Sequence, residues 1–199
     1  IAEIKHGLTT GNNEEVMRAW HEIDCATMGL NFSDYVTAVN SGRKWFPYNK
    51  GGAFRKWFGN AEFVLNYNKD GIRKMETFSG HRHDGKSHFF KAGVTWTLLS
   101  SSYFGSRFTP EGFIFDVNGS SLFTDLAKEV SAFLCSKVGY EFLKFLNPTL
   151  AFQSGNLKNL PVVKFDHALS ERLERIANGA IENCKSDWNA YETSWDFTA

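Results

Sequence analysis

Lysine and arginine residues are interleaved with aromatic residues in one segment, KWFPYNKGGAFRKWFGN, which spans residues 44–60. No acidic residue occurs between Asp34 and Glu62, although the whole chain of 199 residues has no net charge. Lysine and arginine neutralise phosphates, while aromatic rings and amides offer stacking faces and hydrogen-bonding edges to bases. The segment therefore indicates an anionic, planar ligand, and the phosphates and bases of a nucleic acid fit that description.

The glycine and proline residues of this segment favour an exposed loop over a packed element. The alternative interpretation is that the aromatic side chains fill a core while the cations solvate its rim. Under the first interpretation, Tyr48 lies beside the stiff Pro47 and is expected to be exposed and to contact DNA. Trp57 is expected to seal the edge of a sheet instead.

A second interval without acidic residues lies between Asp84 and Glu111 and includes SSSYFGSR, residues 100–107. Small hydroxyl side chains permit close approach to a DNA groove, and Arg107 is expected to reach a guanine edge or a phosphate. The complete set of predicted DNA-binding residues is Arg43, Lys44, Trp45, Tyr48, Asn49, Lys50, Arg55, Lys56, Arg82, Lys86, Ser101, Ser102, Tyr103 and Arg107.

Motifs for catalysis or cofactor binding are missing from the sequence. Neither G-x-G-x-x-G nor G-x-x-x-x-G-K-[ST] occurs, and the serines do not form a G-x-S-x-G elbow. The segment GHRHDGKSH, residues 80–88, holds three histidines and an aspartate, but Arg82 and Lys86 within it would repel a cation. We therefore predict no catalytic residue, no metal ligand and no cofactor for this chain, and a solvated loop for residues 80–88.

The charges are unevenly distributed along the chain. Residues 1–110 carry 14 lysine and arginine residues against 10 acidic ones, whereas residues 111–199 carry 8 against 12. The three cysteines are widely spaced without a C-x-x-C motif, which favours a reducing compartment. No apolar run is long enough to span a bilayer, so we expect a cytoplasmic protein without membrane contact.

The pattern of residues predicts an α+β fold with a twisted, mostly antiparallel sheet, packed helices and a C-terminal amphipathic helix. Residues 1–123 are rich in strands and turns, with turns at Asp70-Gly71 and Asn118-Gly119 and short helices near residues 12–20 and 33–39. Residues 124–147 form two helices, residues 159–165 resemble a strand, and about twenty residues after 166 form the amphipathic helix. We divide the chain into a domain at 1–160 and an extension at 161–199.

Five segments in this order resemble one protein family: GLTTGNN, KWFPYNKGGAFRKWFGN, GVTWTLLSSSYFGSRFTPEGFIFDVNGSSLF, NPTLAFQSGNLKNLPV and SDWNAYETSWDF. Together they resemble the C-terminal target recognition region of large adenine-specific DNA methyltransferases of the BREX or Pgl phage-defence systems, or of fused type II restriction-modification systems. In that family a methyltransferase domain with an S-adenosylmethionine loop and an Asn-Pro-Pro-Tyr motif precedes a domain that reads the DNA sequence. Asn147-Pro148-Thr149-Leu150 lacks the second proline and the aromatic residue of that motif.

The resemblance implies a non-catalytic module for sequence-specific recognition of double-stranded DNA, within a parent enzyme that uses S-adenosylmethionine to methylate adenine N6. Its implied partners are DNA, the parent methyltransferase domain and other defence-system proteins. The alternative is a protein–protein interaction module of the defence complex, since exposed aromatic side chains also anchor protein partners. The resemblance leaves open the target sequence, and whether the parent also cleaves DNA as a restriction endonuclease.

Overall fold

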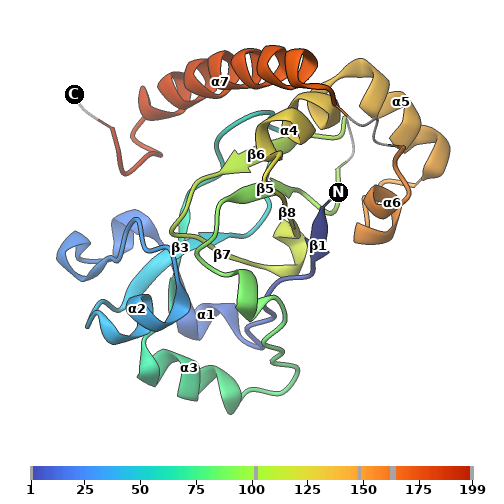
Figure 1. Ribbon diagram of the computed structural model, residues 1–199. Coiled ribbons are helices and arrows are strands. Elements are labelled where there is room, and N and C mark those ends of the chain that lie inside the picture. The colour runs from blue at the N-terminus through green and yellow to red at the C-terminus, as the bar shows by residue number, and fades with distance from the viewer. Residues whose placement is uncertain (1, 101–102, 148, 162–164, 198–199) are drawn as a thin grey trace.

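The computed structural model describes residues 2–100, 103–147, 149–161 and 165–197. Two four-stranded sheets lie at its centre, with strand orders β2-β4-β3-β7 and β1-β8-β5-β6 (Figure 1). The strands are β1 (Glu3–Lys5), β2 (Met17–Ala19), β3 (Trp45–Asn49), β4 (Phe63–Asn66), β5 (Gly93–Trp96), β6 (Ser106–Thr109), β7 (Ile114–Phe115) and β8 (Ser121–Phe123).

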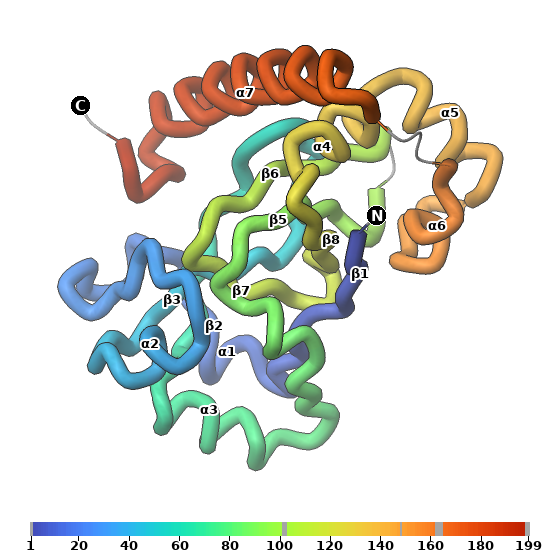
Figure 2. The backbone as a smooth tube through the Cα atoms, in the orientation of Figure 1, coloured from blue at the N-terminus to red at the C-terminus, as the bar shows by residue number. Residues whose placement is uncertain are grey.

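Helices surround both sheets. They are α1 (Asn13–Val16), α2 (Tyr35–Asn40), α3 (Lys69–Glu76), α4 (Ala127–Cys135), α5 (Lys137–Leu146), α6 (Ser154–Lys158) and α7 (His167–Asn189), with 3-10 turns at Trp20–Glu22, Cys25–Thr27, Lys86–His88 and Val117–Gly119. The long helix α7 runs across α4, whereas α2 and α3 lie at the opposite end of the molecule (Figure 2).

Neighbouring strands are antiparallel except for β3 and β7, where Tyr48 and Asn49 pair in parallel with Ile114 and Phe115. The other pairings include Glu3 with Phe123 in β1 and β8. Because β1 and β7 pair with strands far away in the sequence, the formation of each sheet requires a long loop of the chain to close.

The core has three parts, each with its own helices. The β2-β4-β3-β7 sheet packs against α2 and α3 through apolar side chains such as Val39 and Met75. The other sheet packs against α4, α5 and α6 through Trp96, Leu134 and Leu157. A smaller cluster joins α4 to α7.

Side-chain caps explain where several helices begin. The carboxylate of Asp166 accepts a hydrogen bond from the Leu169 amide at the start of α7, and Ser136 caps α5 through the Gly139 amide. Gly139 also permits a tight corner between α4 and α5, since a Cβ there would lie 2.3 Å from the Phe133 carbonyl oxygen.

The predicted α+β class, the mostly antiparallel pairing and the C-terminal helix are confirmed, with two sheets in place of one. The prediction of a turn at Asp70-Gly71 is wrong, because both residues lie in α3. The Asn68 side chain accepts a hydrogen bond from the Gly71 amide and so caps this helix, which begins at Lys69. The strand expected at 159–165 includes residues 162–164, which lie outside the described residues, and residues 159–161 and 165 are not in a strand. The boundary at residue 160 stays a prediction.

Within the described ranges, no helix combines the length and the apolar character needed to cross a bilayer.

Candidate nucleic-acid interface

The predicted loop at residues 44–60 begins instead as strand β3, which lies between β4 and β7. Phe46, Pro47, Tyr48 and Asn49 are buried there, and only Trp45 is partly exposed. The first third of the segment therefore builds the core, as the alternative interpretation had it.

Tyr48 has no exposed surface, which corrects the expectation that it contacts DNA. Its hydroxyl donates a 2.6 Å hydrogen bond to Oδ2 of the buried Asp116. Loss of hydration, followed by the negative charge of Asp116, raises the pKa of Tyr48 well above its usual range. Tyr48 is therefore a structural hydrogen-bond donor that stays protonated.

Lys50 is held by the same carboxylate. Its Nζ lies 2.6 Å from Oδ2 of Asp116, and Oδ1 of that residue accepts a hydrogen bond from the Asn118 amide at 2.8 Å. Since a buried carboxylate needs such a counter-charge, the charge of Lys50 is already used within the fold.

Asn49 and Arg107 are also buried, which corrects their assignment to direct DNA contacts in this conformation. Asn49 donates through Nδ2 to Oγ1 of Thr109 at 3.2 Å. Arg107 is 2% exposed, and its Nη2 donates to Oγ1 of Thr97 at 3.3 Å. Its Nε and Nη1 have no hydrogen-bond partner within the described part of the chain. Neither side chain reaches the surface.

Four predicted residues at the start of β3 and beside α2 are exposed or partly exposed, and they are named here the basic surface: Arg43, Lys44, Trp45 and Lys86. The Lys44 ammonium lies 5.3 Å from the ring centroid of Trp45, and that of Lys86 lies 4.1 Å from the ring of Tyr35. The carbonyl of Lys44 accepts a hydrogen bond from the Tyr67 amide, and the Tyr67 ring contacts Tyr35. Cations and aromatic rings therefore meet at this surface.

Arg55 and Lys56 point instead towards the helices. Lys56 donates through Nζ to the carbonyl of Cys135 at 2.8 Å, at the end of α4. The Arg55 guanidinium lies 4.8 Å from the ring of Trp188 and 3.7 Å from the carboxylate of Asp187, both in α7. These two cations join residues 55–56 to α4 and α7 and lie apart from the basic surface.

Arg82 and Tyr103 are exposed at two further places. Arg82 lies 3.7 Å from the carboxylate of Asp84, beside a hollow that Lys5 and His6 also line. Tyr103, 58% exposed, contacts the rings of Phe54 and Tyr140. Ser101 and Ser102 lie outside the described residues. The predicted DNA-binding residues thus do not form one surface. Some of them lie at separate exposed places, whereas Tyr48, Asn49 and Arg107 are buried.

The three histidines of residues 80–88 are partly buried, in contrast to the solvated loop that we predicted. The ring of His83 contacts Phe89 and is hydrogen-bonded to the Tyr67 hydroxyl. Burial, with Lys86 next, lowers the pKa of His83 to about 4. No group of three or more candidate metal ligands converges among the residues that the structure describes.

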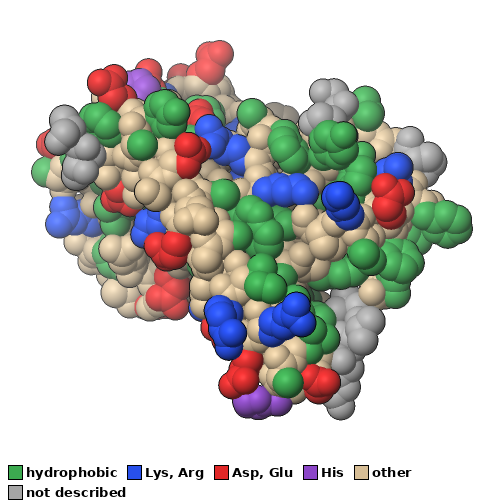
Figure 3. All heavy atoms as spheres, turned by 90° about the horizontal axis from the view of Figure 1, so that it is seen from above, with side chains coloured by type: hydrophobic (Ala, Val, Ile, Leu, Met, Phe, Trp, Pro, Cys, Tyr) green, Lys and Arg blue, Asp and Glu red, His purple; other side chains and the backbone are tan. Residues whose placement is uncertain are grey.

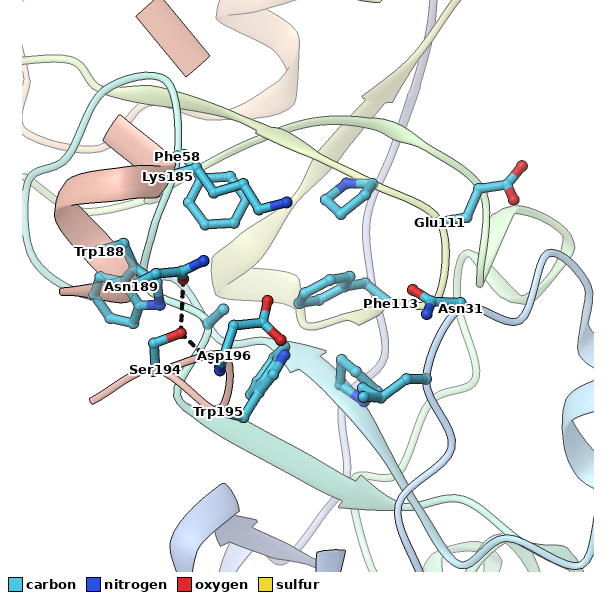
Figure 4. Close-up of a pocket in the computed structure, with 14 residues that line it drawn as sticks. Asn31, Phe58, Glu111, Phe113, Lys185, Trp188, Asn189, Ser194, Trp195 and Asp196 are labelled. Carbon is cyan, nitrogen blue, oxygen red and sulfur yellow. Dashed lines mark hydrogen bonds between the residues drawn. The ribbon is translucent and has the colours of Figure 1, made fainter. Parts of the chain in front are cut away.

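Sequence reasoning missed a hollow of about 300 Å³ beside the C-terminal end of α7 (Figure 4). Aromatic side chains and polar groups from segments far apart in the chain surround it. Its lining residues include Asn31, Phe58, Phe113, Lys185, Trp188, Asn189, Trp195 and Asp196. The aromatic C-terminal segment SDWNAYETSWDF, which we used only for the family resemblance, is the sequence signal that could have indicated it.

Comparison with known proteins identifies the class. No protein-family model matches the chain. Along its length, however, it is homologous to one region of adenine-specific methyltransferases.

One relative, the adenine-specific methyltransferase PglX of Lacticaseibacillus casei (strain Zhang), is 37% identical over 100% of this chain and 17% of its own length. Another, the adenine-specific methyltransferase BrxX of Escherichia coli O9:H4 (strain HS), is 37% identical over 96% of this chain and 15% of its own length. The chain thus corresponds to one region of BREX/Pgl methyltransferases and spans 15–17% of these relatives.

Proposed function

We propose that the chain is the DNA-recognition region of a phage-defence methyltransferase that transfers a methyl group from S-adenosylmethionine to adenine N6. The observation that carries this proposal is the 37% identity to adenine-specific methyltransferases over 96–100% of the chain. The region would read the DNA sequence, while the parent's catalytic domain would hold the cofactor and perform the transfer.

The surroundings of Asn147 support a role without catalysis. Its Nδ2 donates to the Ala151 carbonyl at 2.6 Å, and its Oδ1 accepts from the Thr149 hydroxyl at 2.7 Å. Both ends of the amide are therefore engaged in a local turn, so this side chain does not present its polar groups to a substrate.

The basic surface is the best candidate for phosphate contacts. Arg43, Lys44 and Lys86 are exposed cations, and Trp45 adds a partly exposed ring beside Lys44. Such groups neutralise phosphates whatever the sequence, whereas specificity needs contacts to base edges. Tyr103 is the most exposed of the predicted aromatic residues and is a candidate for such a contact.

A titration of duplex DNA at two salt concentrations tests this proposal. We expect weak binding, with a dissociation constant of roughly 10⁻⁴ to 10⁻⁶ M at physiological salt, that weakens steeply as salt is raised. The double variant Lys44→Glu/Lys86→Glu should weaken binding to all sequences equally and flatten the salt dependence by about one unit per lost contact. Arg175→Glu, at an exposed position of α7, is the matched control. A salt dependence that does not change in the double variant contradicts the proposal.

A second candidate function, protein interaction, is favoured by one face of α5. Val138, Phe142 and Phe145 are 59%, 41% and 86% exposed, and they line a shallow hollow with Lys137 and Glu141. Seen from above, hydrophobic side chains gather at the α5 end, while acidic and basic ones are mixed elsewhere on this face (Figure 3). Exposed apolar patches of this kind mark interaction sites. Binding to other parts of the defence complex that is insensitive to salt, without DNA binding, would favour this second function.

A further inference from the structure

The hollow beside the end of α7 has a preformed wall. The Ser194 hydroxyl donates to Oδ1 of Asn189 at 2.8 Å and accepts from the Asp196 amide at 3.1 Å. The indole N–H of Trp20 donates to the Thr193 carbonyl at 2.9 Å. These bonds fix the turn after α7 against the rest of the fold, so a ligand would meet side chains that are already positioned.

Aromatic rings make up much of the lining. Phe58, Trp188 and Trp195 border the hollow, and the Phe113 ring lies 6.0 Å from that of Trp195 at an interplanar angle of 35°. Trp195 is only partly buried, so part of its surface is free for contact. Flat aromatic surfaces around a cavity favour a planar ligand that can stack on them.

The polar groups offer a donor close to an acceptor. Since Oδ1 of Asn189 is occupied by Ser194, its amide nitrogen remains as a donor. Figure 4 shows this nitrogen and the Asp196 carboxylate turned towards the hollow, with the Lys185 ammonium at another side. Neither Asp196 nor Lys185 has an ion-pair partner among the described residues. The Watson–Crick edges of nucleobases present neighbouring acceptors and donors that match such a pair.

We propose that this hollow binds a nucleobase of an unstacked nucleotide, stacked on Trp195 and hydrogen-bonded to Asn189 and Asp196. The inference rests on the proposed DNA binding and names one site for it. Two carboxylates, Glu111 and Asp196, line the hollow with Lys185, and that of Glu111 points away from Asn189 and Asp196 (Figure 4). A cationic ligand at Asp196 fits less well, because Lys185 lines the same hollow and Arg55 lies 4.8 Å from the ring of Trp188. Lys185 would neutralise the phosphate of the bound nucleotide instead.

Three DNA duplexes test the inference: one fully paired, one with a single bulged adenosine, and one with a bulged abasic nucleotide. The abasic bulge bends the duplex without offering a base. Since stacking on an aromatic side chain contributes about 1–3 kcal/mol per base, we expect the bulged adenosine to bind about five- to 150-fold more tightly than the other two. The quenching of tryptophan fluorescence reports binding for each duplex.

Trp195→Ala should abolish this preference while leaving the affinity for the paired duplex unchanged. Asp196→Ala should reduce it and serves as a second variant in case Trp195→Ala does not fold. Tyr191→Ala, in the same turn but outside the lining, is the matched control and should keep the preference. A melting curve of each variant checks folding.

Equal affinity for all three duplexes overturns the base site and leaves the proposed DNA binding intact. Absence of binding to any duplex overturns both. Quenching by N-acetylarginine methylamide without a preference for the bulged adenosine also overturns the base site and makes the hollow a cation site.

Discussion

Replacing Arg107 with methionine should stabilise the fold. The guanidinium is 2% exposed, and its single hydrogen bond among the described residues goes to Oγ1 of Thr97. Burial lowers the pKa of Arg107 to about 10. Compared with an exposed arginine, this corresponds to about 3 kcal/mol of free energy opposing the charged form in the folded state.

Methionine removes this charge and fills much of the same volume, but it forfeits the hydrogen bond to Thr97, worth about 1 kcal/mol. We therefore expect Arg107→Met to raise the free energy of unfolding by about 1–2 kcal/mol, within the range known for replaced buried charges. For a chain of this size, that corresponds to a melting temperature higher by about 2–8 °C.

Thermal and urea unfolding, followed by tryptophan fluorescence, measure the effect. Arg55→Met is the matched control: the Arg55 side chain is 38% exposed and lies over Trp188. That variant should lose stability slightly, by about 0.5–1 kcal/mol of cation–π energy. An Arg107→Met protein that melts below the wild type would refute the reasoning, because the buried guanidinium would then be a net stabilising group.

Three further predictions follow from buried and exposed groups. Tyr48→Ala should lower the free energy of unfolding by about 3–5 kcal/mol, and Tyr48→Phe by about 1.5–3 kcal/mol through loss of the hydrogen bond to Asp116. Urea unfolding measures both losses. A loss below about 1 kcal/mol would contradict the burial of this ring. Because the pKa of His83 is about 4 in the fold and near 6.5 in an unfolded chain, the unfolded chain binds more protons between these values. Stability should therefore fall as pH is lowered from 6.5 to 4, and a His83→Gln protein with the same pH dependence would disprove this cause. Phe145→Ser should change stability by less than about 0.5 kcal/mol, since the ring is 86% exposed, and a larger loss on melting would place this ring in the core.

The helices were predictable because their signals are local. Apolar residues four and three apart, such as Leu169, Leu173 and Ile176 in α7, together with the Asp166 cap, are sufficient to predict an amphipathic helix. Strand β3 was not predictable from the sequence, because Pro47 taken by itself favours a loop. At Pro47 the strand has β4 as its only paired neighbour, since β7 reaches only Tyr48 and Asn49, and proline is tolerated at such positions.

The exposure of the predicted site residues was harder to predict than the helices, because burial of a side chain depends on partners from distant segments. Nothing near Lys50 in the sequence shows that its charge meets Asp116, 66 residues away. The hollow in Figure 4 likewise joins Asn31, Phe58, Phe113 and Trp195, whose spacing carries no pattern. The basic surface remained exposed because Arg43, Lys44 and Lys86 flank elements that pack through their apolar faces.

The pairing of strands distant in the sequence bears on how fast this chain folds. Neither sheet is complete until Glu3 has met Phe123 and Tyr48 has met Ile114, and Trp20 bonds to Thr193, 173 residues away. Each such contact requires closure of a long loop before it gives any stability in return. We therefore expect refolding on the millisecond-to-second scale typical of non-local β topologies, with a transient interval in which unpaired strand edges are open to aggregation.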